Sequence, residues 1–289
     1  MNLFITGASG YIGSAVAAAL IERGHRVRGL ARSDRAAEIV RGVGASPVAG
    51  SLTDLDVLEA EAAAGDGVIH TAADPGSSRA DIDKAAVEAM LSAMRGGLFV
   101  TTSGAPRARS SRTPVVESDV APLGGPLDWL AHAEDRVLKA TTARGIVVRP
   151  PIVYGDGGGP LARMAQSASA GGAYVIDGGE NCWSTVHVRD LARAYVLLAE
   201  SEARGVFHVA EREPEPMLGL WRAIAEAASV QLQPRTLAEA IEADGPLAAF
   251  LAMDAALDAT RLGTLGWTPE IGASMGGIRG ALASGNALP

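Results

Sequence analysis

A glycine-rich stretch near the start of the chain carries the strongest chemical signal in the sequence. Gly7, Gly10 and Gly13 follow the spacing G-x-x-G-x-x-G. They stand between an apolar run at Asn2–Thr6, which predicts a buried strand, and helical spacing over Ser14–Arg23. In such an arrangement the first glycine permits a tight turn, the second lets the backbone approach a pyrophosphate, and the third allows close helix–strand packing. The stretch therefore predicts a dinucleotide-binding loop; the alternative is a purely structural turn.

The end of the second predicted strand, His25–Ala31, favours one form of the dinucleotide. A carboxylate there would bond the adenosine ribose hydroxyls and favour NAD. The chain has Arg32 instead, whose planar guanidinium is suited to the 2′-phosphate of NADP. We predict NADP(H) as the cofactor, with NAD possible; the alternative for Arg32 is a solvated surface arginine. The predicted cofactor-binding residues are Gly7, Ser9, Gly10, Tyr11, Ile12, Gly13, Arg32, Ser51, Leu52, Thr71, Ala72 and Ala73.

Strands and helices alternate through roughly the first 155 residues, which predicts βαβ units and a parallel sheet. The expected fold class is α/β: a Rossmann, doubly wound parallel sheet with a smaller C-terminal substrate lobe. The expected domains are residues 1–155 completed by 183–203, and a lobe of 156–182 and 204–289. Helices are expected at Asp34–Gly42, Leu55–Ala64 (with a Thr53-Asp54 cap), Asp83–Met94, Leu127–Arg144, Val188–Ser201, Met217–Ala228, Leu237–Ala243 and Ala248–Leu262.

Composition excludes several classes of protein. The 289 residues are 48% hydrophobic and 20% charged, so a packed core is expected. The single cysteine, Cys182, excludes a disulfide framework and a cysteine-rich zinc site, and we predict no metal site. A net charge of −8 argues against nucleic-acid and membrane partners. With neither a signal peptide nor a membrane helix in the sequence, we expect a cytoplasmic location. Positive charge that is nearly all arginine, with abundant alanine, indicates a GC-rich bacterial source.

Several stretches together resemble the short-chain dehydrogenase/reductase superfamily, in its extended and atypical branch of NAD(P)-dependent epimerase/dehydratase-like proteins. They are TGASGYIG at 6–13, VIHTAAD at 68–74, LFVTTSG at 98–104, VVRPPIVYGDGGG at 147–159, WSTVHVRDLARAYVLL at 183–198 and LGWTPE at 265–270. The resemblance implies that the N-terminal part binds the dinucleotide and that the C-terminal lobe closes over the substrate. It places Ser103 at the family's catalytic serine. Asp190 is more simply an N-cap for the helix that follows.

The family's proton donor, a tyrosine with a lysine four positions later, is absent. Lys84 and Lys139 are the only lysines, and the residues four positions earlier are Ala80 and Asp135. Trp129 is one candidate for the tyrosine position. His132 is a candidate donor because imidazole titrates near neutrality; its alternative is a helix-surface histidine. Tyr154 is a second candidate, and its alternative is packing under the nicotinamide.

We therefore expect an NADP-dependent oxidoreductase, a reductase that transfers hydride to a small carbonyl or unsaturated metabolite. The alternatives are a non-catalytic NADP(H)-binding sensor or scaffold and a sugar-nucleotide epimerase or dehydratase. The last is disfavoured, because those reactions need a base poised to take a hydroxyl proton. The expected partner is a small-molecule substrate, with the chain as a monomer or homodimer. Arg107, Arg109 and Arg112 fit either an anionic substrate or a solvated loop.

Overall fold

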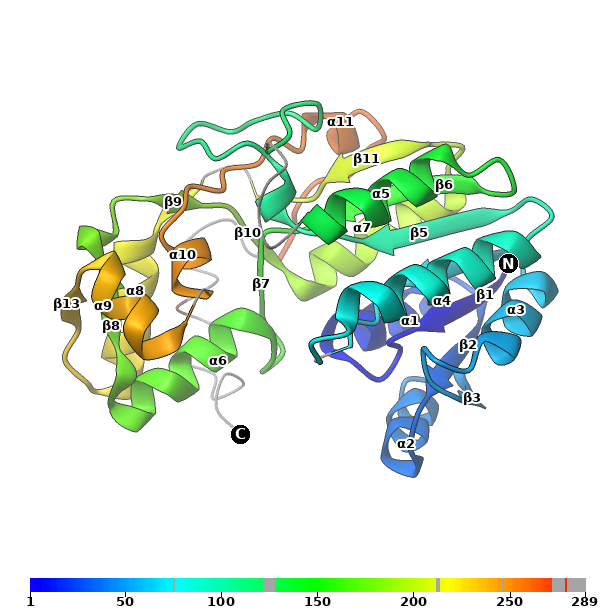
Figure 1. Ribbon diagram of the computed structural model, residues 1–289, viewed down its shortest axis with the longest axis horizontal. Coiled ribbons are helices and arrows are strands. Elements are labelled where there is room, and N and C mark those ends of the chain that lie inside the picture. The colour runs from blue at the N-terminus through cyan, green and yellow to red at the C-terminus, as the bar shows by residue number, and fades with distance from the viewer. Residues whose placement is uncertain (75, 122–127, 212–213, 246, 272–278, 280–289) are drawn as a thin grey trace. The chain divides into compact units, whose positions relative to one another are not determined.

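The apolar runs that alternate with helices assemble into a seven-stranded sheet in the order β11-β6-β5-β4-β1-β2-β3 (Figure 1). The computed structural model describes residues 1–289 apart from 75, 122–127, 212–213, 246, 272–278 and 280–289. Neighbouring strands from β3 to β6 pair in parallel. This strand order, with helices between the strands, confirms the predicted Rossmann α/β fold. The elements are β1 (Asn2–Thr6), α1 (Tyr11–Glu22), β2 (Arg26–Ala31), α2 (Asp34–Gly42), β3 (Ser46–Ala49), α3 (Leu55–Ala64), β4 (Gly67–His70), α4 (Arg79–Ala93), β5 (Leu98–Thr102), α5 (Asp128–Lys139), β6 (Arg144–Arg149), α7 (Val188–Glu200) and β11 (Gly205–His208).

Helices cover both faces of this sheet. In Figure 1, α3, α4 and α5 lie side by side on one face, and α1 and α7 lie on the other. The core under the first group joins strand residues such as Phe4 and Phe99 to helix residues such as Leu58, Met90 and Val137. Because strands in a parallel sheet are buried on both sides, they appear in the sequence as continuous apolar runs.

The chain divides into two compact units. The first takes in the described residues of Met1–Ser103, Leu123–Arg149 and Ala192–Phe207, and the second those of Gly104–Pro122, Pro150–Leu191 and His208–Pro289. This partition differs from the expected domains. The chain leaves the first unit at the end of β5 and again at the end of β6, so residues 104–121 and 150–155 belong to the second unit.

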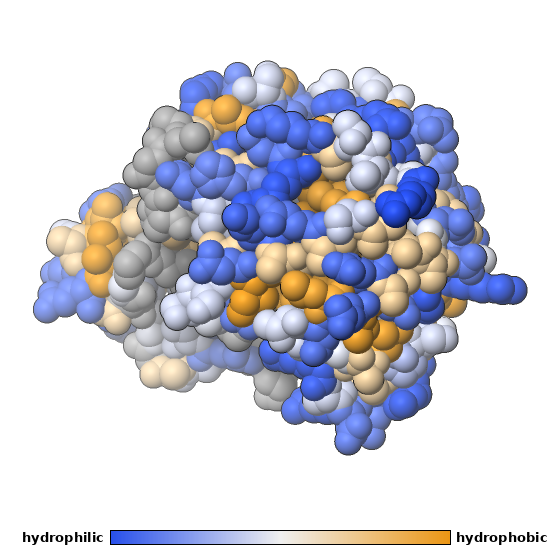
Figure 2. All heavy atoms as spheres, turned by 45° about the vertical axis from the view of Figure 1, so that its right-hand side comes forward, coloured by the Kyte–Doolittle hydropathy of each residue, from blue (hydrophilic) through white to orange (hydrophobic). Residues whose placement is uncertain are grey.

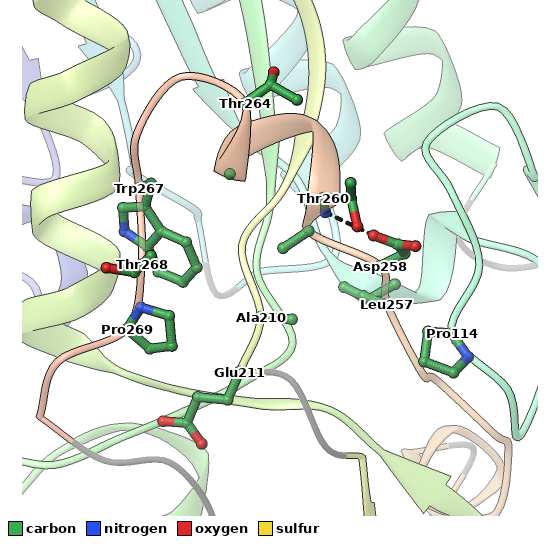
Figure 3. A pocket seen from close by; sticks show the side chains of 12 residues that line it. Pro114, Ala210, Glu211, Leu257, Asp258, Thr260, Thr264, Trp267, Thr268 and Pro269 are labelled. Atoms are coloured by element: carbon green, nitrogen blue, oxygen red, sulfur yellow. Dashed lines mark hydrogen bonds between the residues drawn. The ribbon is translucent and has the colours of Figure 1, made fainter.

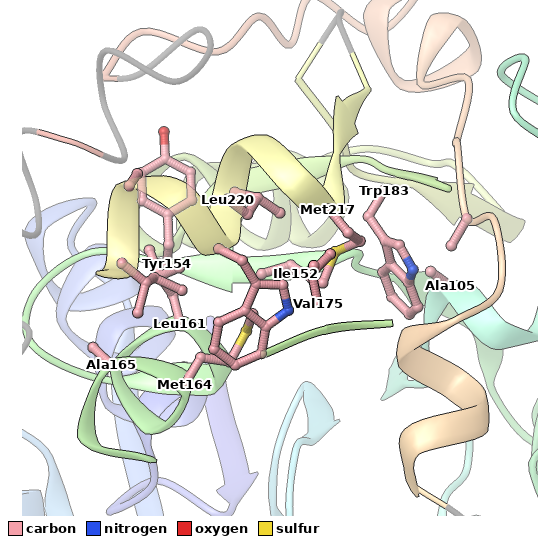
Figure 4. Packing of buried hydrophobic residues seen from close by; sticks show 14 of the residues in the cluster. Ala105, Ile152, Tyr154, Leu161, Met164, Ala165, Val175, Trp183, Met217 and Leu220 are labelled. Atoms are coloured by element: carbon pink, nitrogen blue, oxygen red, sulfur yellow. The ribbon is translucent and has the colours of Figure 1, made fainter. Parts of the chain in front are cut away.

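The second unit combines short paired strands with separate helices. Strand β10 pairs in parallel with β7, β13 pairs in parallel with β8, and β12 pairs antiparallel with β9. Its core packs aromatic residues such as Tyr154, Trp183 and Trp221 against Leu161 and Leu220 (Figure 4). The elements are β7 (Ile152–Tyr154), α6 (Gly159–Ser167), β8 (Tyr174–Ile176), β9 (Cys182–Trp183), β10 (Thr185–His187), β12 (Glu215–Pro216), α8 (Met217–Ala228), β13 (Gln233–Arg235), α9 (Leu237–Asp244), α10 (Leu247–Leu251) and α11 (Thr260–Gly263).

The helix expected over Ala248–Leu262 is wrong. Only its ends are helical, as α10 and α11. Between them, Ala255 forms a β-bridge with Trp183, and Leu257 forms one with Val115. The segment has the alanine content of a helix, but these backbone pairings with distant segments override that local propensity.

Two predicted helix caps are also wrong. The Asp54 carboxylate does not cap α3; it accepts hydrogen bonds from the backbone N–H of Ser51 at 2.7 Å and from its hydroxyl at 2.8 Å. Asp190 lies inside α7, where its carboxylate accepts from the backbone N–H groups of Glu270 and Ile271. Both carboxylates therefore fix a loop or a distant segment rather than a helix end. Helix α5 also ends at Lys139, five residues before the expected end, and Leu127 lies outside the described residues.

Apolar and hydrophilic side chains alternate on the face shown in Figure 2. The large hydrophobic residues that are exposed are scattered through the chain, and such isolated residues are normal on a protein surface. In the described part of the chain, the structure contains no helix with the length and apolar character needed to cross a membrane. The exposed large hydrophobic residues are Met1, Ile39, Val116, Val120, Leu138, Ile241 and Ile271.

A buried ion pair fastens α5 to the sheet. Arg149 ends β6, and its Nε and Nη2 donate to Glu134 Oε1 at 2.8 Å and Oε2 at 2.6 Å. The two residues are 1% and 3% exposed. Removing one member of such a pair leaves the other charge buried without its partner. The resulting loss of stability is larger than the net contribution of the intact pair.

We expect Glu134→Ala to lower the free energy of unfolding by about 3–5 kcal/mol, because it leaves the Arg149 guanidinium buried without its carboxylate. Asp135→Ala is the matched control, since it breaks the exposed Asp135–Lys139 pair on the same helix. We expect the control to cost less than about 0.5 kcal/mol. Urea unfolding followed by circular dichroism measures both, and equal losses would contradict the prediction.

Candidate functional site

The glycine loop joins β1 to α1 in the first unit with no room for side chains. Gly7 adopts a φ of +76°, and a Cβ built there would lie 2.7 Å from both Ala72 N and Thr71 Oγ1. A Cβ on Gly13 would lie 2.2 Å from the carbonyl oxygen of Gly7. Gly10 stands at the N-cap of α1 and has no side chain to cap it. The N-terminus of α1 is therefore presented in the way that suits a phosphate group.

A cavity of about 310 Å³ lies at this loop, entirely within the first unit. Apolar Leu30, Leu52 and Ile82 line part of it, which suits an adenine ring, and Arg32 lines it with an exposed side chain. The fit to the adenosine half of a dinucleotide is good, because the cavity combines an apolar slot, a helix N-terminus and glycines that a Cβ would fill. Its lining residues are Gly7, Ser9, Gly10, Leu30, Arg32, Gly50, Ser51, Leu52, Thr53, Thr71, Ala72, Ala73, Asp74 and Ile82.

Most of the predicted cofactor residues line the cavity. Tyr11, Ile12 and Gly13 do not; they begin α1 next to the loop. The predicted set lacks five of the lining residues, which are Leu30, Gly50, Thr53, Asp74 and Ile82. Ile82 comes from α4, and its position depends on how that helix packs, so no local motif could have found it.

The turn after β3 is held by its own side chains. The hydroxyl and the backbone N–H of Ser51 both bond the Asp54 carboxylate, and these bonds lower the pKa of Asp54. The carboxylate is thus ionised at neutral pH and keeps Ser51 at the cavity edge.

Of the three predicted catalytic residues, Ser103 and His132 lie in the first unit and Tyr154 lies in the second. Ser103 follows β5 in the first unit, and its buried Oγ has no hydrogen-bond partner among the described residues. His132 is exposed on α5 while Ala131 and Ala133 beside it are buried, the placement of a helix-surface histidine. Tyr154 belongs to the second unit and is fully buried.

Tyr154 is a packing residue of the second unit (Figure 4). Its hydroxyl donates to Glu211 Oε1 at 2.7 Å, and its ring meets the His187 ring edge-on at 5.3 Å. Burial lowers the pKa of His187. This environment favours packing, the alternative that the sequence left open, over proton donation.

Another tyrosine lies beside the end of β5. The Tyr195 hydroxyl on α7 lies 2.6 Å from Thr102 Oγ1, and burial raises the pKa of Tyr195. No role for Thr102 or Tyr195 is predicted from the sequence. Trp129, the candidate for the family's tyrosine position, lies under the Arg79 guanidinium instead, with 5.9 Å between them.

The loop arginines bond within the second unit. Arg109 lies 3.8 Å from the Asp119 carboxylate, and Arg112 donates to the Glu180 carbonyl. Arg107 is buried, and its guanidinium donates to the carbonyl of Ala121. These contacts favour the structural reading of the three arginines over substrate binding.

A second cavity, of about 510 Å³, lies within the second unit (Figure 3). Its walls include the Trp267 ring, Leu257 and Ala210, with the carboxylates of Glu211 and Asp258. None of the residues predicted for cofactor binding or catalysis lines it.

Comparison with known proteins bears on the family. A family model described as "NAD(P)H-binding" matches residues 7–179. An uncharacterized protein of Schizosaccharomyces pombe is 32% identical over 264 residues, 88% of this chain and 90% of that protein. A 4-hydroxy-2-methyl-3-oxo-4-farnesyl-3,4-dihydroquinoline-1-oxide ketoreductase of Stigmatella aurantiaca is 28% identical, over 81% of this chain and 75% of that protein. A 2-alkyl-3-oxoalkanoate reductase of Stenotrophomonas maltophilia is 29% identical, over 75% and 72%.

Solved structures share the fold. The NAD complex of Thermus thermophilus UDP-glucose 4-epimerase matches with a TM-score of 0.77 and 21% identity, covering 98% of both chains. At that identity the match shows the fold alone. The family model and this structural match together support the predicted dinucleotide-binding Rossmann fold. The relatives come from a fungus and from bacteria, so they do not support the predicted bacterial source.

We expect Gly13→Ala to weaken dinucleotide binding at least about tenfold, because the added methyl group cannot coexist with the Gly7 carbonyl and must displace the loop. Gly42→Ala is the control: it ends α2 with open space around its Cβ position. Fluorescence titration with NADPH and NADH measures both variants. Normal affinity in Gly13→Ala would show that the loop does not hold the dinucleotide.

Proposed function

The chain belongs to the NAD(P)H-binding family, and from this premise we propose that it is an NADP-dependent reductase of a small carbonyl or unsaturated compound. The observation that carries the proposal is the cavity at the glycine loop, with its apolar slot and its exposed arginine. Two relatives named as reductases of 3-oxo compounds support a carbonyl substrate. Both are similar over at least 72% of their own length.

Arg32 supports NADP over NAD. It follows the last residue of β2 and lines the cavity, at the point where an acidic side chain would bond the ribose hydroxyls. A guanidinium attracts the negative charge of a 2′-phosphate and can bond two of its oxygens at once.

Ser103 is the residue that we propose binds the substrate. Its buried hydroxyl has no partner among the described residues, and a buried hydroxyl is stabilised by gaining one. When bound, the reduced dinucleotide supplies a hydride to the carbonyl carbon. The Ser103 hydroxyl donates a hydrogen bond to the carbonyl oxygen and stabilises its developing charge. Because the chain has no Tyr-Lys pair, water or another group of the chain supplies the proton.

The missing pair also supports a second candidate, a protein that binds NADP(H) as a sensor or scaffold without turnover. Epimerase or dehydratase chemistry has less support, since the epimerase likeness extends to the fold alone. We further propose a small-molecule substrate as partner, a monomer or homodimer, and a cytoplasmic location. The acidic balance supports the exclusion of nucleic-acid and membrane partners.

We expect Arg32→Ala to weaken NADPH binding by about 1–3 kcal/mol and to change NADH binding little, because the lost bonds are those to the 2′-phosphate. Arg41→Ala removes the same charge from the exposed end of α2 and does not touch the cavity, so it controls for long-range electrostatics. Isothermal titration with both dinucleotides measures the difference. Equal losses for NADPH and NADH, or a parent that prefers NADH, would overturn the NADP assignment.

Turnover is tested by NADPH oxidation against a panel of ketones, 3-oxo esters and enones. With any accepted substrate, we expect Ser103→Ala to lower kcat roughly a hundredfold, the usual loss of a carbonyl-oxygen donor. We expect His132→Ala to stay close to the parent because His132 is exposed. A loss confined to His132→Ala would assign the proton donor to that residue. Tight NADPH binding with no turnover on the whole panel would favour the sensor.

A further inference from the structure

A buried histidine connects two walls of the dinucleotide cavity. His70 ends β4; its Nδ1 lies 2.7 Å from Thr6 Oγ1, and its Nε2 lies 3.0 Å from Asp83 Oδ1. Thr6 is fully buried, His70 is 2% exposed and Asp83 is 9% exposed. A strand end, an imidazole and a helix carboxylate thus form one chain of hydrogen bonds inside the first unit.

The chemistry of the three groups fixes the direction of one bond. An ionised carboxylate only accepts, so the Nε2–H of His70 donates to Asp83. Nδ1 then faces the Thr6 hydroxyl, which can donate to it or accept from it. The second oxygen of Asp83, Oδ2, is buried and has no hydrogen-bond partner among the described residues. His70 is therefore the hydrogen-bond donor that holds this carboxylate within the described structure.

At one end, the chain of hydrogen bonds reaches the glycine loop. Thr6 directly precedes Gly7, and the Thr6 carbonyl accepts from Thr71 N at 3.1 Å and from Thr71 Oγ1 at 2.8 Å. Thr71 Oγ1 is also the atom that a Cβ on Gly7 or Gly13 would meet at 2.7 Å. A shift of Thr6 would therefore move the loop against Thr71, one of its close neighbours.

At its other end, the chain of hydrogen bonds reaches the cavity wall formed by α4. Asp83 follows Ile82, which lines the cavity, and both belong to the first turns of α4. The imidazole of His70 thus fixes the glycine loop and α4 relative to each other, although His70 itself does not line the cavity.

We propose that His70 is a positioning residue for the dinucleotide: it couples α4 to the glycine loop, and the affinity for the dinucleotide depends on the intact Thr6–His70–Asp83 chain. The inference rests on one part of the proposed function, the binding of the dinucleotide, and does not require that any substrate is reduced. A purely structural role would lower stability without a specific effect on affinity.

A double-mutant cycle separates these roles. Thr6→Val removes the hydroxyl at nearly constant shape, and Asp83→Ala removes the carboxylate; the two residues meet only through His70 in the described contacts. We expect each variant to raise the Kd for NADPH about tenfold, and the double variant to raise it little further, because either change breaks the same chain. Thr6→Ser keeps the hydroxyl and should restore parental affinity.

Thr142→Val is the matched control, since the Thr142 hydroxyl donates to the Leu91 carbonyl at 2.7 Å near the far end of α4. We expect it to lower the melting temperature with unchanged Kd. Additive effects of Thr6→Val and Asp83→Ala, or falls in melting temperature without a change in Kd, would overturn the proposal. A parent that bound neither dinucleotide would overturn the proposed function as well.

The parent protein allows the same test if a variant does not fold. The ring ¹⁵N signals of His70 report its two hydrogen bonds, and we expect them to shift when saturating NADPH is added. Unchanged His70 signals in the NADPH-bound parent would contradict the coupling.

Discussion

At the glycine loop, the backbone after β1 lies so close to the first turn of α1 and to the residues after β4 that Gly7 and Gly13 have no room for a side chain. A Cβ on Gly13 in α1 would lie 2.2 Å from the Gly7 carbonyl oxygen, and one on Gly7 would lie 2.7 Å from Ala72 N after β4. This approach fixes where α1 begins and aims its N-terminus at the cavity. Because the carboxyl ends of parallel strands meet at one edge of a sheet, Arg32 after β2 and Ser51 after β3 reach the same cavity. Cofactor recognition in the first unit therefore follows from a steric constraint set by glycines.

The dependence of the site on closely spaced glycines explains how much of it could be predicted from the sequence. Glycine spacing and apolar runs are local, so β1, α2, α3 and α8 were predicted with the bounds that the structure has. The contribution of Ile82 and the His70–Asp83 bond could not be predicted, because both depend on the packing of α4. The same limit applies to Ala255 and Leu257, which form β-bridges with distant segments although the sequence around them has a helical composition. Asp190 looks like a helix cap until the distant N–H groups of Glu270 and Ile271 are known.

Helix α5 is fixed to the sheet by a buried charge. It buries an acid, Glu134, against Arg149 at the end of β6. Both side chains of this bidentate pair are buried and bond each other, so removing either one would leave the other buried without its partner. The exposed side of α5 carries His132 and Lys139. The buried pair of α5 thus contributes stability and holds the helix against β6.

The proposed carbonyl reduction suits the side chains at the end of β5. Oxidation of a hydroxyl, the first step of an epimerase, needs a group that takes its proton. Among the described residues at the end of β5, the groups that could act on a substrate oxygen are the hydroxyls of Ser103 and Thr102. The Thr102 hydroxyl lies next to that of Tyr195, and burial raises the pKa of Tyr195. Such groups hold a carbonyl oxygen well and remove a proton poorly. Carbonyl reduction requires a proton donor instead of a base, because the oxygen gains a proton. Water can supply that proton once the hydride has been transferred. The hydroxyls at β5 therefore suit reduction, and they suit it without the Tyr-Lys pair.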